Sequence, residues 1–288
     1  METSDDFWRR NAESPQSNAE GPQIEQRQAA QQAKTRAGGA RSAAVRYRFI
    51  ARGGPEEDPP PLARLLRGGG GKGGAARLRL YLSLLWLSRN DDAPRFEYPA
   101  HQWARLLGFD SPDTAGARRV QQALRWLDEQ AFVRLQHRQG ASSAIHLLSD
   151  AGTGRPYQAP GLAMKRLAVK AQREEHLYVQ LPAGLWTKGW ISDLSGAAVA
   201  MYLVLLHERR GEDKTVWLSP RIGRERYDLS DETRRKGLNE LAQHQLVSVR
   251  RRPVHQGLFE DHFRSRNVYE LNPEDLDRYE PGEQHPWF

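Results

Sequence analysis

Residues 124–135, LRWLDEQAFVRL, decide the fold, because their apolar residues change within one short stretch from helical spacing to alternation. Residues 238–249, LNELAQHQLVSV, repeat this change at the same point. Helical spacing of apolar residues is typical of an amphipathic helix, and alternation is typical of a half-buried strand. Both stretches therefore predict a helix that leads directly into a strand.

The elements around these two stretches also occur twice. Tyr81 corresponds to Tyr202 and Pro99 to Pro220 at one common offset, so the repeat covers most of each half. Each copy predicts a long apolar helix (75–88 and 195–209), a short strand ending at the proline, a short helix (99–107 and 220–227), a third helix and a closing strand (144–148 and 267–271). This order predicts two tandem winged helix-turn-helix domains in an α+β, mainly α, fold.

Composition sets the expected boundaries of these domains. Residues 1–60 are rich in Gln, Ala, Ser, Pro and Gly, so they predict a disordered N-terminal arm. The first domain is expected over 61–150, with a basic glycine-rich linker at 61–74 and the fold itself from about residue 75. The remaining segments are a linker with a basic helix (151–176), the second domain (177–272) and a C-terminal tail (273–288).

The charge of the chain favours a polyanionic partner. The net charge is +7 and the isoelectric point is about 9.8, with arginine far commoner than lysine among 43 basic residues. A GC-rich genome would also enrich arginine. The absence of cysteine excludes disulfides and cysteine-ligated metal centres. With no signal peptide and no membrane-spanning apolar run, we expect a cytoplasmic protein, associated with the nucleoid or a plasmid.

The third helix of a winged helix-turn-helix domain enters the major groove, and the side chains opposite its apolar face read bases. Arginine pairs with guanine and glutamine with adenine, so this chemistry suits base reading, although an ordinary solvated helix carries the same residues. In the first copy the candidates are Arg118, Arg119, Gln121, Gln122 and Arg125. In the second copy they are Arg234, Arg235, Lys236 and Asn239.

The two predicted hairpins differ in charge. The first hairpin is short, and Arg138 near its tip is the one candidate for DNA contact. The second hairpin is long and has basic residues on both strands, a pattern that suits contact with phosphates or the minor groove. Its candidates are Arg250, Arg251, Arg252, Arg264 and Arg266.

Residues 178–186, YVQLPAGLW, and 190–202, WISDLSGAAVAMY, follow a recognisable order: a strand ending in Leu-Pro, a short apolar element and a Leu-Ser-x-x-Ala helix start. This order resembles the opening of winged-helix plasmid replication initiators, and the resemblance extends over about residues 75–272. It implies binding to short origin repeats, local opening of the origin and recruitment of host replication proteins. It implies no chemistry by the chain itself.

No catalytic residue, metal ligand or cofactor is expected. The sequence has no His-x-His pair, and Gly73 rather than Ser or Thr follows the lysine of the glycine-rich segment, so a phosphate-binding loop is not predicted. Three functions remain open: a replication initiator, a transcription regulator or partition-type DNA-binding protein, and a non-catalytic scaffold subunit of a larger complex. The expected partner is double-stranded DNA, with host replication proteins or a second copy of the chain as further candidates and no membrane.

Overall fold

The computed structural model describes residues 20–54, 56–68, 72–88, 91–167, 173–209, 214–254 and 264–283. About 52% of it is helix and 18% is strand, which confirms the expected α+β class with helix predominating. No helix in these ranges is long and apolar enough to cross a bilayer.

One order of elements occurs twice. The first unit has α5 (Lys72–Leu87), β2 (Arg95–Phe96), α6 (Ala100–Leu106), a π-turn η1 (Pro112–Gly116), α7 (Ala117–Glu129), β3 (Val133–Arg138) and β4 (Ala141–Leu147). The second has α12 (Gly196–Glu208), β6 (Thr215–Val216), α13 (Pro220–Tyr227), α14 (Asp231–Gln243), β7 (Val247–Val254) and β8 (Arg264–Leu271). The last strand of each unit is the central one of a three-stranded sheet, in the orders β2-β4-β3 and β6-β8-β7.

The link between the third helix and its strand is built alike in both units. Ala131 and Gln245 adopt the left-handed conformation there, with φ of 56° and 58°. The next amide in each unit closes the helix: Phe132 N–H donates to the Leu127 carbonyl at 2.8 Å, and Leu246 N–H to that of Leu241 at 3.0 Å. Such a left-handed residue ends a helix and satisfies its last carbonyls. The repeat is therefore present in the backbone as well as in the sequence.

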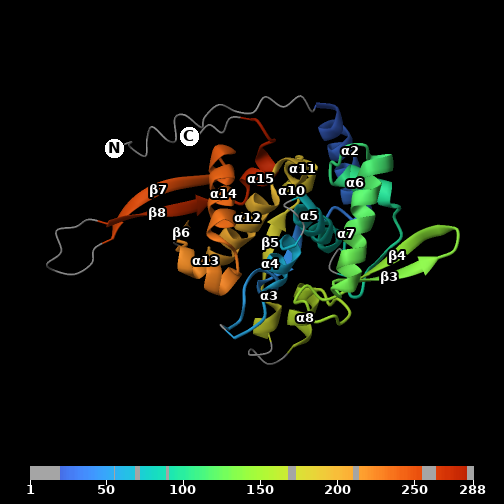
Figure 1. The fold of residues 1–288 in the computed structure, drawn as a ribbon, viewed down its shortest axis with the longest axis horizontal. Coiled ribbons are helices and arrows are strands. Elements are labelled where there is room, and N and C mark those ends of the chain that lie inside the picture. The colour runs from blue at the N-terminus through green and yellow to red at the C-terminus, as the bar shows by residue number, and fades with distance from the viewer. Residues whose placement is uncertain are drawn as a thin grey trace.

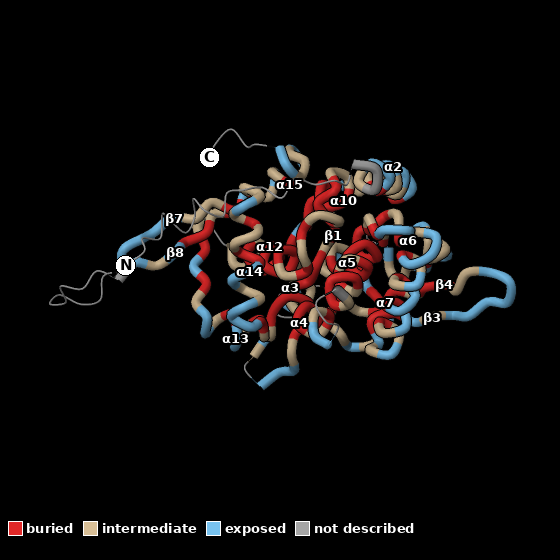
Figure 2. Tube along the Cα trace, turned by 45° about the horizontal axis from the view of Figure 1, so that its top comes forward, coloured by how far each residue is buried: buried red, intermediate tan, exposed pale blue. Residues whose placement is uncertain are grey.

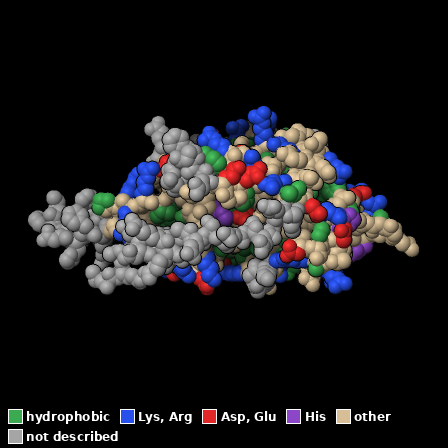
Figure 3. Space-filling model, turned by 90° about the horizontal axis from the view of Figure 1, so that it is seen from above, with side chains coloured by type: hydrophobic (Ala, Val, Ile, Leu, Met, Phe, Trp, Pro, Cys, Tyr) green, Lys and Arg blue, Asp and Glu red, His purple; other side chains and the backbone are tan. Residues whose placement is uncertain are grey.

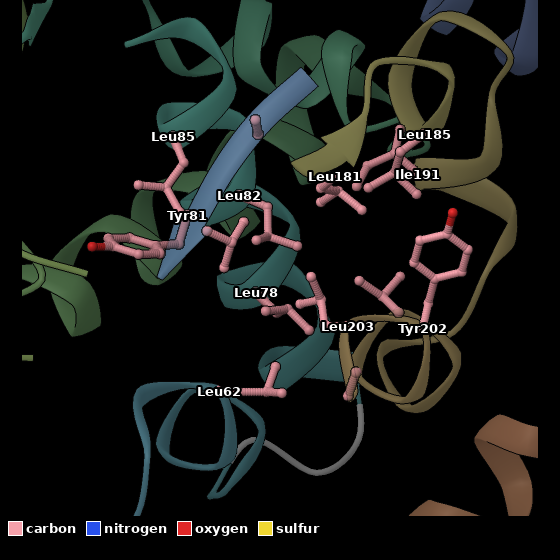
Figure 4. Packing of buried hydrophobic residues seen from close by; sticks show 14 of the residues in the cluster. Leu62, Leu78, Tyr81, Leu82, Leu85, Leu181, Leu185, Ile191, Tyr202 and Leu203 are labelled. Carbon is pink, nitrogen blue, oxygen red and sulfur yellow. The ribbon is translucent and has the colours of Figure 1, made fainter. Parts of the chain in front are cut away.

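The two units share one hydrophobic core. The long helices α5 and α12 pack against each other, and buried residues from both units form a single cluster. Figure 4 shows leucines of α5 and Leu203 of α12 pointing into the same interior. Trp86 and Trp186 stack across the interface with their rings 4.6 Å apart. Figure 2 shows buried residues following α5 and α12 through the middle of the molecule, whereas the tip of the β3–β4 hairpin is exposed.

A further strand precedes each unit, and these two strands pair with each other. β1 (Ser42–Arg46) lies antiparallel to β5 (Tyr178–Pro182), with Ala44 opposite Gln180 at the centre. Antiparallel pairing of two equivalent strands is the arrangement that a local two-fold axis produces. β1 and β5 are therefore related to each other by an approximate two-fold rotation.

The prediction that residues 1–60 form a disordered arm is wrong for the described residues from Glu20 onward. They contain α2 (Glu20–Arg36), β1 and α3 (Tyr47–Ile50), and both Phe49 and Ile50 are fully buried. Gln26 of α2 is also fully buried, and its amide Nε2 donates to the carbonyls of Leu106 and Trp186, each at 3.0 Å. Those carbonyls belong to the ends of α6 and α10 (Gly184–Thr187), so α2 joins the two units. Residues 1–19 lie outside the described ranges.

The other predicted linkers are also part of the packed structure. In the segment 61–74, α4 (Pro61–Leu66) contacts α5, and a Cβ on Gly74 would lie 2.4 Å from the Leu66 carbonyl oxygen. In the segment 151–176, the basic helix is α8 (Pro160–Arg166), and a 3-10 turn η2 (Glu174–His176) lies further along the chain. Tyr157, before α8, is buried. In the tail, α15 (Asp275–Arg278) buries Leu276 against the second unit.

Candidate nucleic-acid interface

The third helices lie on the outside of the molecule. Figure 1 shows α7 and α14 on opposite sides of the central α5 and α12, with the hairpins β3–β4 and β7–β8 extending away in opposite directions. The helical pattern of α7 buries Val120, Ala123, Leu124 and Leu127 against the core. The face opposite these residues is left to solvent.

This face of α7 contains four of the five side chains predicted for it. Arg118, Gln121, Gln122 and Arg125 are all exposed. Arg119 differs, because it is half-buried at the edge of the helix, with its guanidinium carbon 4.6 Å from the centre of the Phe109 ring. Within the described ranges, Arg118 and Arg125 form no ion pair, so their charges are not neutralised by a neighbouring carboxylate.

The corresponding face of α14 is more nearly neutral. Lys236 forms an ion pair with Glu232 at 2.7 Å, and this hydrogen bond lowers the pKa of Glu232. Arg235 is exposed, whereas Asn239 is half-buried. Some of the hydrogen-bonding groups that α14 would need to read bases are thus already used in contacts within the helix.

Arg234 has a structural position that the sequence did not predict. It is half-buried and reaches toward the start of α13. Its Nη1 lies 3.5 Å from the carbonyl of Leu218, two residues before that helix. A Cβ on Gly223 would lie 3.2 Å from its Cδ, so the stem of Arg234 packs against the first helix of the pair. Arg234 therefore holds α13 and α14 together rather than facing outward with Arg235.

The two hairpins show the opposite contrast, because the candidate arginine of the first hairpin is neutralised and three of those in the second are exposed. In the first, Arg138 is neutralised by Glu97, and the hydrogen bond from Arg138 lowers the pKa of that carboxyl. In the second, Arg250, Arg251 and Arg252 are exposed, with Arg250 3.5 Å from Glu270. Arg266 stacks on the Trp217 ring at 4.6 Å. The side chain of Arg264 lies outside the described residues.

The turn before each third helix is held by residues that lie outside both units. In the second unit Asp228 adopts a left-handed conformation between α13 and α14, with φ of 53°. Its carboxylate pairs with Arg52 at 3.0 Å and with Arg67, and Arg52 N–H donates to the Arg226 carbonyl at 2.9 Å. Both arginines precede the first unit, where the sequence had predicted an arm and a linker. No local pattern identifies them.

The turn of the first unit is held in a matching way. Gly108 has φ of 64°, and a Cβ there would lie 2.4 Å from Cβ of Ser192 in α11 (Trp190–Asp193) and 3.3 Å from Cγ of Gln26. Only glycine fits so close an approach at positive φ without strain. Because both turns contact segments that pack on the shared core, the third helices α7 and α14 are fixed relative to each other.

A buried charge pair lies away from this surface. Arg46 and Asp150 are 4% and 0% exposed, and Arg46 also donates to the Gln158 carbonyl and contacts His176 Nδ1 at 3.2 Å. Burial raises the pKa of Asp150, and the donors of Arg46 oppose that rise. The network ties β1 to the end of β4 and to η2. In the described ranges no three His, Asp or Glu side chains gather into a metal site.

On the face of the molecule shown in Figure 3, basic side chains lie among acidic ones rather than in a single patch. Comparison with known proteins found no family model, curated protein or solved structure that matches the chain. The function must therefore be inferred from the geometry of the helices and hairpins themselves.

Proposed function

We propose that the two units are winged helix-turn-helix domains and that the protein binds double-stranded DNA in a sequence-specific manner. The observation that carries the proposal is the exposed face of α7, where Arg118, Gln122 and Arg125 lie opposite the buried residues. Arginine and glutamine in this position match the hydrogen-bonding edges of guanine and adenine in the major groove. The second hairpin adds arginines that suit phosphate contact.

The shared core supports one composite binding site per chain. We infer that the two-fold rotation that relates β1 to β5 extends to the units, so that their third helices would meet DNA in opposite orientations, as the halves of a symmetric dimer do. The side chains on the two helices differ, however, with Arg118 and Arg125 in one and Glu232 and Lys236 in the other. We therefore expect two inverted half-sites of unequal sequence.

Among DNA-binding proteins we favour a replication initiator that acts on origin repeats. The support is the order of elements at residues 178–202, where β5 ends in Leu181-Pro182 and Ser195 caps α12 by accepting from the Ala198 amide at 3.1 Å. Origin opening and recruitment of host replication proteins would follow from that class, as would a location at a plasmid or the nucleoid. The proposal assigns no chemistry and no cofactor to the chain.

Selection of bound duplexes from a random library, followed by affinity measurements, tests DNA reading. Arg125→Ala should weaken binding to the selected site by about 1–3 kcal/mol and leave random duplex binding nearly unchanged. Arg155→Ala, an exposed arginine outside α7, is the control and should change neither. Replacing Arg250, Arg251 and Arg252 together should weaken both kinds of binding and reduce the salt dependence. Failure to bind any duplex at low salt would leave the scaffold function.

Footprinting then separates the two DNA-binding functions. Protection of an array of short repeats beside a replication origin is the result expected of an initiator. Protection of one palindrome within a promoter would instead assign the protein to the transcription regulators.

A further inference from the structure

One exposed side chain of the second sheet, Trp217, is not explained by duplex reading. In its sheet Val216 pairs with Tyr269, which places the next residue, Trp217, opposite Val268. Arg250 pairs with Val268 and Arg252 with Arg266. Residues directly opposite in a sheet share a face, as do residues two apart along a strand. The side chains of Trp217, Arg250, Arg252 and Arg266 therefore lie on one face, which we name the tryptophan–arginine face.

Trp217 is unusually accessible for its type. Its exposed fraction is 45%, whereas the other tryptophans in the described ranges are buried or half-buried. The Arg266 guanidinium stacks on its ring at 4.6 Å, so an aromatic surface and a cation are presented together. Trp217 lies outside the main hydrophobic core, which has Val216 and Leu271 on the other face of the sheet, although the buried Val268 is on the same face as Trp217.

Basic side chains are close together on this face. Arg252 and Arg266 are directly opposite each other on β7 and β8. Glu270 is the acidic side chain on the same face, and it lies 3.5 Å from an Arg250 that is 68% exposed, which makes a weak pair. A polyanion bound to this face would meet several cationic side chains at once.

The first unit shows that the fold does not require a tryptophan here. Phe96 pairs with Ile145 as Val216 pairs with Tyr269, so the residue after it, Glu97, corresponds to Trp217. Glu97 neutralises Arg138 and Arg95. The same position thus has a carboxylate that pairs with a hairpin arginine in one unit, and an aromatic ring beside the hairpin arginines in the other.

We propose that the tryptophan–arginine face binds single-stranded nucleic acid. An unpaired base stacks on Trp217, and Arg250 and Arg252 contact the adjoining phosphates. Aromatic rings in a basic groove bind single strands without sequence preference, because every base has a π-face that is free to stack. A duplex keeps its bases stacked inside, so the ring gains this contact only from an unpaired strand. The site is separate from the exposed face of α7.

Fluorescence anisotropy with labelled oligothymidylate tests the proposal on the full chain. Trp217→Ala should weaken this binding about 5- to 150-fold, the effect of losing one stacked base, while Trp217→Phe retains most of it. Arg221→Ala, an arginine on α13 that is 76% exposed, is the control and should have no effect. Both Trp217 variants should bind the selected duplex as the wild type does, whereas Arg125→Ala should weaken the duplex and spare the single strand.

Four results would overturn the proposal. The first is an equal affinity of the Trp217→Ala variant and the wild type for oligothymidylate. The second is failure of the wild type to bind oligothymidylate at low salt. Equal weakening of duplex binding by Trp217→Ala would make Trp217 a groove contact of the hairpin. Competition by polyglutamate as effective as that by an oligonucleotide of equal charge would assign the face to an acidic protein. Failure of duplex selection alone would remove the proposed function and leave this site standing.

Discussion

The substitution Gln26→Leu tests whether α2 is part of the fold. The Gln26 side chain is fully buried, and its amide donates to two carbonyls, of Leu106 and Trp186, that end helices in different units. Leucine keeps the size of the side chain but leaves both acceptors buried without a donor. Each stranded acceptor costs about 1–3 kcal/mol, and the added apolar burial offsets part of this, so we expect a loss of roughly 2–4 kcal/mol in the free energy of unfolding.

Urea denaturation followed by circular dichroism measures this loss, with Gln28→Leu as the matched control. Gln28 lies on the same helix but is exposed, so the same substitution there should change stability by less than about 0.5 kcal/mol. Gln26→Glu gives a second, stronger test, because it replaces the donor by a carboxylate facing two carbonyl oxygens and should cost more than leucine does. Equal stability of the Gln26→Leu and Gln28→Leu variants would refute the docking of α2.

Three further predictions concern the remaining contacts between segments. Asp228→Asn tolerates the left-handed turn but loses the ion pairs to Arg52 and Arg67, so a loss of about 1 kcal/mol that shrinks in high salt is expected in urea titrations. Burial lowers the pKa of His176 below its usual value of 6.5, so the unfolded state binds the proton at a higher pH than the folded state does. The free energy of unfolding should therefore fall as the pH drops below 6.5. His176→Gln should remove that part of the pH dependence in thermal melts. Gly74→Ala should destabilise by about 1–3 kcal/mol through the clash with Leu66, whereas Gly73→Ala, with only an arginine tip 3.9 Å away, should stabilise by up to about 1 kcal/mol; the same sign for both in calorimetry would contradict this.

The repeated helices and hairpins could be predicted because their signal is local. The third helix of each unit is defined by apolar residues within its own length, and α13 has the predicted bounds of Pro220 and Tyr227. The strand β1 has no such signal. Ala43 and Val45 are buried because β1 pairs with β5 and packs against α5, both of which are distant along the chain. A contact of this kind depends on the fold as a whole, so composition suggested disorder where the chain is packed.

Glycine was the other source of error. Gly74 lies in the predicted linker and Gly196 in the predicted helix start. A Cβ on either glycine would meet a neighbouring segment at 3.0 Å or less. Glycine is chosen both where a chain must move and where two backbones must approach closely. Sequence alone does not distinguish these two causes, so the predicted linker at 61–74 was wrong for the parts that the structure describes.

The candidate site was predictable where helical spacing alone decides exposure. That rule placed Arg118, Gln122 and Arg125 together on α7. It failed for residues at the edge of a face, because a helical wheel does not show what packs beside it. Arg119 meets Phe109, and Arg234 meets α13. Trp217 was missed, although its place between two buried residues, Val216 and Leu218, is the alternation expected of a strand with one exposed side chain.

The distribution of ion pairs bears on how the proposed functions divide between the units. In the first unit the exposed arginines of α7 have no carboxylate partner among the described residues, whereas Arg138 in its hairpin is neutralised by Glu97. In the second unit Lys236 of α14 is paired with Glu232, and the hairpin has two arginines directly opposite each other. In the first unit, exposed arginines without a described carboxylate partner thus lie on α7, whereas the second unit has its densest set of arginines on the hairpin. Sequence reading would then depend mainly on α7 and backbone attraction on the second hairpin. Because one core fixes both elements, the loss of either contribution should leave the other intact.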